Sequence, residues 1–189
     1  MKVAIYSRGV DMDQQQSLNA LLTELYRYDV DIFVFEDLIR KFDLKAIEGK
    51  PALMPFKDSH DLHNAVDCLI SVGGDGTVLD AITLVGDTNI PILGVNYGRL
   101  GFLASISKDE LSLMVDALAN RSYVIDKRTL IHLDADIPVF GATPFALNEF
   151  AIHKRDTSPM IKIHTYLNGE FLNSYWADGL IVATPTGST

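Results

Sequence analysis

The sequence has little cysteine and little basic charge. Cys68 is the single cysteine in 189 residues, which excludes an internal disulfide framework and a thiolate metal cluster. Its apolar neighbours suit a small core residue. Lys and Arg number 16 against 25 Asp and Glu, a formal net charge of -9. Nucleic acid and anionic membranes attract basic patches, so neither is expected as a partner. A small anionic substrate would need a local cluster of donors.

Long hydrophobic runs are also missing from the N-terminus. The apolar run within residues 1–6 is too short for a signal-peptide core or a membrane span, so we expect a cytoplasmic protein. Disorder is excluded by composition, since 48% of the residues are hydrophobic and 22% are charged. The length is sufficient for one domain or two small ones.

Strand-like and helix-like segments alternate up to residue 121. Apolar β-rich runs predict strands at residues 2–7, 31–35, 67–72 and 90–95. Helical spacing predicts helices at residues 14–28, 77–85 and 108–119. Such alternation favours an α/β domain with a parallel sheet and helices on both faces.

The pattern changes after residue 121. Extended segments are predicted at residues 123–136, 145–153, 161–167, 170–176 and 180–184, and Asn168-Gly169 is a strong hairpin signal. We therefore expect an α/β domain at residues 1–121 and a β-rich domain at residues 122–189. That second domain looks incomplete in this chain, because its strands are too few to close a sandwich.

A glycine-rich loop joins the predicted strand at residues 67–72 to the next helix. Its glycines permit positive φ and close backbone approach, and the helix start offers free N–H groups, a general arrangement for phosphate binding. The loop follows a strand's carboxyl end, where open α/β sheets bind ligands. The candidate phosphate-binding residues are Gly73, Gly74, Gly76 and Thr77. Neither a P-loop nor a Gly-x-Gly-x-x-Gly fingerprint is present.

Asp75 is the unexpected member of this loop, because a carboxylate would repel an anion. It is therefore a candidate general base or magnesium partner. The alternative is a glycine-rich turn in which Asp75 caps the helix.

Three further segments carry polar groups in suggestive places. Residues 94–103 leave another strand by a glycine-rich turn, which either forms a crevice with the first loop or is an ordinary connection. Asn148 and Glu149 interrupt an apolar run, and neighbouring strand residues point to opposite faces. An amide and a carboxylate suit adenine or ribose hydroxyls, with a solvated edge or bulge as the alternative.

The last segment combines Asp178-Gly179, which alone would be a hairpin turn, with a hydroxyl-rich loop at residues 184–189. Such a loop offers uncharged donors to phosphates or ribose, but also occurs as a plain surface turn. The basic pairs at residues 127–128 and 154–155 either supply a local positive field or are exposed charges.

Together, in this order, the segments at residues 73–76, 96–103, 148–149 and 178–189 resemble the NAD kinase (ATP-NAD kinase) family. The family shows Gly-Gly-Asp-Gly, Asn-x-Gly-x-Leu-Gly-Phe-Leu, an Asn-Glu/Asp pair and Asp-Gly followed by Thr-Pro-Thr-Gly-Ser-Thr. The first loop alone is shared with diacylglycerol-type lipid kinases and, loosely, with phosphofructokinases.

The resemblance implies an enzyme that transfers the γ-phosphate of ATP to the 2′-hydroxyl of the adenosine ribose of NAD, with Asp75 as the base and Mg²⁺ bridging the donor phosphates. The implied NAD-binding residues are Asp75, Gly76, Asn148, Glu149, Asp178, Thr186 and Thr189. It also implies a homo-oligomer, either a dimer or a tetramer. Family members usually continue beyond the position of Thr189. The alternatives are a diacylglycerol-type lipid kinase and a non-catalytic nucleotide-binding module.

Overall fold

The computed structural model describes residues 1–9, 12–41, 50–98, 101–141, 143–155 and 159–188. The chain forms two compact units, Met1–Ile125 (unit 1) and Asp126–Thr189 (unit 2). Within these ranges, no helix is long and apolar enough to cross a membrane.

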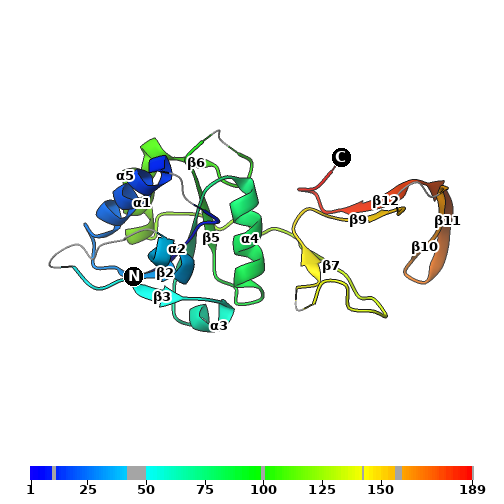
Figure 1. Ribbon diagram of the computed structural model, residues 1–189, viewed down its shortest axis with the longest axis horizontal. Helices are drawn as coiled ribbons and strands as arrows, with labels where there is room; N and C mark the ends of the chain where they lie inside the picture. Colours follow the sequence, from blue (N-terminus) through cyan, green and yellow to red (C-terminus); the bar gives the residue numbers. More distant parts are fainter. Residues whose placement is uncertain (10–11, 42–49, 99–100, 142, 156–158, 189) are drawn as a thin grey trace. The chain divides into compact units, whose positions relative to one another are not determined.

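Unit 1 is built on a six-stranded parallel sheet with the order β3-β2-β1-β4-β5-β6 (Figure 1). Its strands are β1 (Lys2–Tyr6), β2 (Asp31–Phe35), β3 (Met54–Phe56), β4 (Cys68–Val72), β5 (Ile92–Asn96) and β6 (Ile106–Ser107). Every residue of β4 is buried, as expected for a central strand covered on both faces.

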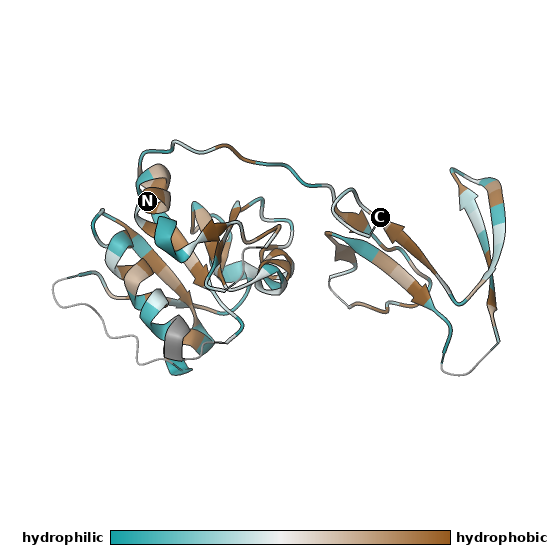
Figure 2. Cartoon of the chain, turned by 90° about the horizontal axis from the view of Figure 1, so that it is seen from above, coloured by the Kyte–Doolittle hydropathy of each residue, from teal (hydrophilic) through white to brown (hydrophobic). Residues whose placement is uncertain are grey.

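Alternate side chains of the strands enter two different cores. Val3 and Ile5 pack with α1 (Met12–Leu25) and α5 (Leu111–Ala119). Ala4 lies between them and packs on the opposite face with α3 (Ser59–Leu62) and α4 (Asp75–Val85). The remaining helical segments are α2 (Glu36–Lys41) and the 3-10 turn η1 (Lys108–Glu110). In Figure 2 the hydrophobic strands of this unit run between the helices.

The strand order fixes where a ligand can bind. From β1 the chain builds outward through β2 and β3, and then continues on the other side of β1 with β4, β5 and β6. The order in which strands are added across the sheet therefore reverses between β1 and β4. These two strands are parallel neighbours, paired through Val3–Cys68 and Ile5–Ile70. In open α/β sheets the crevice beyond the carboxyl ends at such a point is the usual ligand site.

In the described part of unit 2 the chain forms three antiparallel strand pairs. They are β7 (Ile131–His132) with β8 (Phe145–Ala146), β9 (Glu149–His153) with β12 (Gly179–Ala183), and β10 (Ile161–Leu167) with β11 (Glu170–Ala177). Asn168 and Gly169 both have positive φ, 52° and 87°, and turn β10 into β11. This is the hairpin that the sequence predicts.

The predicted fold class is confirmed: a parallel α/β unit is followed by a β-rich region. Some limits differ from the expectation. The helix expected at residues 77–85 begins two residues earlier, at Asp75, because Gly74 takes the N-cap position. The extended segment expected at residues 123–136 forms a strand only at Ile131–His132. Sequence patterns also missed the short elements α2, β3, α3 and β6.

Candidate active site

The glycine-rich loop at residues 73–76 turns the chain sharply from β4 into α4. Gly73 has φ of +149°, and its N–H donates to the Val95 carbonyl at 2.9 Å, so the loop is tied to β5. A Cβ at position 73 would lie 2.4 Å from Thr77 Oγ1, which requires glycine there. Thr77 is buried, with 7% exposure, and its side chain packs against Gly73 on the inner side of the turn.

Asp75 is the first residue of α4, and its carboxylate is held by a second loop. Oδ1 accepts the N–H groups of Leu103 and Ala104, both at 2.9 Å, and Oδ2 accepts that of Phe102 at 3.0 Å. These amides are held in place because residues 103 and 104 pack on β5, where a Cβ at Gly94 would lie 2.7 Å from Ala104 Cα. The structure thus brings the two predicted glycine-rich segments together at Asp75.

The ionisation of Asp75 reflects this setting. Burial raises the pKa of its carboxyl, but the three backbone N–H groups stabilise the anion and lower the pKa below its usual value. Asp75 also lies in the first turn of a helix, where negative charge is favoured. In the first turn of α4 the Thr77 N–H donates to the Gly74 carbonyl at 2.9 Å. The N–H groups before it belong to the start of a helix, a position that favours binding of an anion.

Arg8 and Asp80 lie at the same edge of the sheet, and pattern reasoning missed both. Arg8 follows β1, and its Nε and Nη2 donate to the two carboxylate oxygens of Asp80 on α4. Tyr6 Oη also donates to Asp80, at 3.3 Å. Arg8 thereby holds the pKa of the Asp80 carboxyl below its usual value. The third guanidinium nitrogen, Nη1, lies 3.0 Å from where a Cβ on Gly76 would stand.

The segment at residues 94–103 is partly described. Asn96 ends β5 and is buried, and its Oδ1 accepts the Gly98 N–H at 2.7 Å, which closes a tight turn. Arg99 and Leu100 lie outside the described residues.

The other predicted residues lie in unit 2, where Asn148 and Glu149 meet the hydroxyl-rich loop. The sequence argument assumed that both residues lie in a strand. Only Glu149 does, because β9 begins there and Asn148 precedes it. The Thr184 N–H donates to the Asn148 carbonyl at 2.8 Å. Glu149 Oε2 accepts the Ser188 N–H at 2.9 Å, and bonds from the Ser188 side chain and backbone lower the Glu149 pKa.

The loop at residues 184–188 packs closely on residues 147 and 148. Thr184 and Thr186 both donate their hydroxyls to the Leu147 carbonyl, Thr186 at 3.1 Å. A Cβ at Gly187 would lie 2.2 Å from the Asn148 carbonyl oxygen, so only glycine permits this approach. Asn148 Oδ1 is buried and has no hydrogen-bond partner among the described residues. A buried acceptor without a donor favours a ligand hydroxyl or amine.

Asp178 lies between β11 and β12, which pair with different strands, so Asp178-Gly179 is not a hairpin turn. Lys154 binds it twice: its N–H donates to the Asp178 carbonyl, and Nζ lies 2.8 Å from Oδ1. The Asp178 side chain is still 72% exposed, so it can reach a ligand. Thr189, also predicted to bind NAD, lies outside the described residues.

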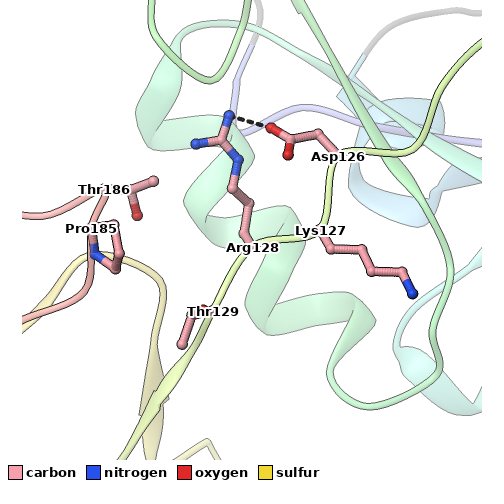
Figure 3. A pocket seen from close by; sticks show the side chains of 6 residues that line it. All are labelled: Asp126, Lys127, Arg128, Thr129, Pro185 and Thr186. Atoms are coloured by element: carbon pink, nitrogen blue, oxygen red, sulfur yellow. Dashed lines mark ion pairs between the residues drawn. The ribbon is translucent and has the colours of Figure 1, made fainter.

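A cavity of about 250 Å³ lies beside the hydroxyl-rich loop (Figure 3). Arg128 and Thr186 line it from two segments, together with Asp126, Lys127, Thr129 and Pro185. Arg128 forms an ion pair with Asp126, drawn as the dashed line in Figure 3. The predicted basic pair at residues 127–128 therefore does border a hollow that is partly lined by hydroxyls.

Comparison with known proteins links both halves to one family. The family model described as the ATP-NAD kinase N-terminal domain matches residues 53–123, and the ATP-NAD kinase C-terminal domain matches residues 147–189. The first match contains the loop at residues 73–76, and the second contains Asn148, Glu149 and Asp178.

Whole-chain comparisons agree with the family models. The chain is 44% identical over 189 residues to the NAD kinase of Cytophaga hutchinsonii, with 100% of this chain and 64% of the relative covered. It is 41% identical over 192 residues to the NAD kinase of Bacteroides fragilis, with 100% and 64% covered. Among solved structures, yeast NADH kinase complexed with NADH matches with a TM-score of 0.84 and 26% identity, covering 100% of this chain and 59% of that one. The chain thus spans just under two thirds of the length of these curated relatives.

Proposed function

Since the chain belongs to the ATP-NAD kinase family, we propose that it carries the phosphoryl-transfer site of an NAD kinase. The enzyme transfers the γ-phosphate of ATP to the 2′-hydroxyl of the adenosine ribose of NAD and gives NADP. One observation carries the proposal. Asp75 begins α4 beside the strand-order reversal between β1 and β4, and its carboxylate is fixed by the backbone N–H groups of residues 102–104.

In the proposed reaction, the ribose 2′-oxygen attacks the γ-phosphorus, and the bond from that phosphorus to the bridging oxygen of ADP breaks. The electron pair leaves with ADP, and the hydroxyl proton passes to Asp75. Oδ2 of Asp75 accepts one backbone N–H, which leaves it a lone pair for the 2′-hydroxyl. A lowered pKa makes Asp75 a weak base. A weak base suffices because phosphoryl transfer has a loose transition state that relies mainly on positioning.

Unit 2 supplies the proposed contacts to the NAD hydroxyls. Asn148 Oδ1 would accept a ribose hydroxyl and so gain its missing donor. Glu149 is held in its charged form by Ser188, which suits it to accept a further hydroxyl. Thr186 and Asp178 would complete this set, Thr186 from the lining of the cavity and Asp178 from an exposed position.

Mg²⁺ is proposed to arrive bound to the donor phosphates. Among the described residues, no group of three or more His, Cys, Asp or Glu side chains could hold a metal ion. Mg²⁺ commonly binds through substrate phosphates and one or two carboxylates, so the chain need not contain a preformed metal cage. The ion would neutralise charge on the phosphates during transfer.

A homo-oligomer is part of the same proposal. Large apolar side chains are exposed on the β10–β11 hairpin, Trp176 by 72% and Phe171 by 59%. Exposed apolar surface of this kind favours burial against another subunit. Sedimentation of the full-length protein would test it: a monomer at all concentrations contradicts the proposal.

The direct test incubates the full-length protein with NAD, ATP and Mg²⁺ and measures NADP with an NADP-specific dehydrogenase. Diacylglycerol is offered in a parallel reaction as the acceptor for the rival lipid-kinase activity. NADP formation is expected. Phosphorylated lipid without NADP would contradict the proposal, and ATP binding without either product would favour a non-catalytic nucleotide-binding module.

A further inference from the structure

Arg8 is a cationic residue beside the start of α4. It lies just beyond the carboxyl end of β1, on one side of the strand-order reversal, while the loop at residues 73–76 lies beyond β4 on the other side. Ligands of open α/β sheets bind between two such neighbouring strand ends. The protein's net charge is -9, so a cation at this edge matters for holding a polyphosphate.

The orientation of the Arg8 side chain is set by Asp80. The Asp80 carboxylate accepts hydrogen bonds from Nε and Nη2, the side-on edge of the guanidinium. These two parallel bonds fix the orientation of both side chains. The guanidinium carries five N–H groups, of which a side-on carboxylate takes two. Its end-on edge, formed by Nη1 and the second Nη2 hydrogen, is not part of that pairing.

Nη1 faces the start of α4. A Cβ at Gly76 would lie 3.0 Å from it, so the missing side chain of glycine is what lets the guanidinium approach the helix. The Arg8 side chain is 58% exposed, compared with 31% for Asp80, so solvent and ligands reach Arg8 more readily. The guanidinium therefore lies beside Gly76 in the first turn of α4, the end of the helix that favours an anion.

We propose that Arg8 binds the phosphates of ATP through its end-on edge, and that Asp80 is the positioning residue that orients Arg8 for this role. The proposal rests on the proposed kinase function. A planar guanidinium matches two phosphate oxygens, which a lysine ammonium does not. Asp80 remains bound during the reaction and itself contacts no phosphate.

The test compares the steady-state kinetics and the ATP affinity of three variants of the full-length protein. Arg8→Met removes the charge, Arg8→Lys keeps the charge without the fork, and Asp80→Asn keeps Arg8 but loosens its orientation. The control is Arg27→Met. The side chain of Arg27 is 52% exposed, similar to that of Arg8, and it pairs with Glu24. Arg27 follows α1 and lies at the edge of the sheet opposite the carboxyl ends of the strands.

Arg8→Met is expected to raise KM for ATP and the calorimetric Kd for ATP about tenfold or more, with KM for NAD within about twofold of wild type. Arg8→Lys should fall between wild type and Arg8→Met, and Asp80→Asn should raise KM for ATP less than Arg8→Met does. Arg27→Met should change neither constant.

Two results would overturn the proposal. One is an unchanged ATP affinity in Arg8→Met together with equal losses of melting temperature in Arg8→Met and Asp80→Asn, which would make the pair purely structural. The other is an equal rise in KM for ATP and for NAD, which would indicate general distortion. If the wild type makes no NADP, the kinase proposal fails by itself. Calorimetry with ATP then still tests Arg8, and a wild type that does not bind ATP also overturns the role of Arg8.

Discussion

Gly101→Ala should disrupt the candidate site although it replaces no charged residue. A Cβ at this position would lie 2.1 Å from Asp75 Oδ1 and 2.6 Å from Cγ, far inside van der Waals contact. Asp75 cannot yield easily, because three backbone N–H groups hold its carboxylate. The added methyl group must therefore displace either the carboxylate or the loop that binds it.

The size of the effect follows from those three bonds. A hydrogen bond to a charged group contributes about 1.5–3 kcal/mol, and water replaces part of this at a half-buried site. We expect a loss of about 2–4 kcal/mol in the free energy of unfolding. That corresponds to a melting temperature lower by on the order of 10 °C in a unit of this size. A misplaced Asp75 should also reduce turnover about 100-fold.

Denaturant unfolding of four variants tests this reasoning: Gly101→Ala, Gly98→Ala, Asp75→Ala and the double variant of Asp75→Ala with Gly101→Ala. Gly98→Ala is the matched control for stability, because the nearest atom to its added Cβ is Asn96 Oδ1 at 3.7 Å, an ordinary contact. In an Asp75→Ala background, Gly101→Ala should cost less than about 0.5 kcal/mol, because the clash has been removed. If Gly101→Ala costs the same in both backgrounds, Asp75 is not the cause and the reasoning is refuted.

Three further predictions concern Asp75 and the hydroxyl-rich loop of unit 2. Asp75→Asn should lower turnover about 10²–10⁴-fold while calorimetry finds NAD affinity largely intact; near-normal turnover would rule out Asp75 as the base. Because the folded pKa of Asp75 is lowered, its stabilising effect is present above the unfolded value of 3.8 and is lost as pH falls through the lower folded pKa. The stability gap between wild type and Asp75→Asn should therefore stay constant from pH 7 to about 4 and shrink below, and a gap that shrinks at neutral pH would contradict the assignment. Gly187→Ala should weaken NAD binding more than about tenfold, since its Cβ would lie 2.2 Å from the Asn148 carbonyl oxygen; unchanged affinity would separate this loop from the site.

Local patterns in the sequence predicted the longer elements but not the contacts between them. The apolar run at residues 67–72, followed by two glycines, predicts both β4 and the loop, because burial and glycine freedom are local properties. The amides that hold Asp75 come from residues 27 to 29 positions later, and the partner of Arg8 is 72 positions away. No spacing rule reaches across such separations. Sheet order brings these residues together, and only the structure provides it.

The hydroxyl-rich loop illustrates the same limit in unit 2. Its composition predicts donors for a ligand, yet Thr184 and Thr186 donate their hydroxyls to the Leu147 carbonyl. Among the described residues of unit 2, the buried side-chain atom without a hydrogen-bond partner is instead Oδ1 of Asn148, an acceptor. Residue types alone could not distinguish a hydroxyl that shapes the loop from one that faces a ligand.

We propose that the full-length protein phosphorylates the ribose of NAD with Asp75 as the base, and a single-turnover experiment can decide this. Full-length wild type and Asp75→Asn are each mixed in excess over NAD with ATP and Mg²⁺, and ³¹P NMR follows the products. We predict that wild type forms a 2′-phosphate on the adenosine ribose with one ADP released per NADP, and that Asp75→Asn binds both substrates without forming it. A phosphate at any other position, or a 2′-phosphate formed equally fast by Asp75→Asn, would contradict the account.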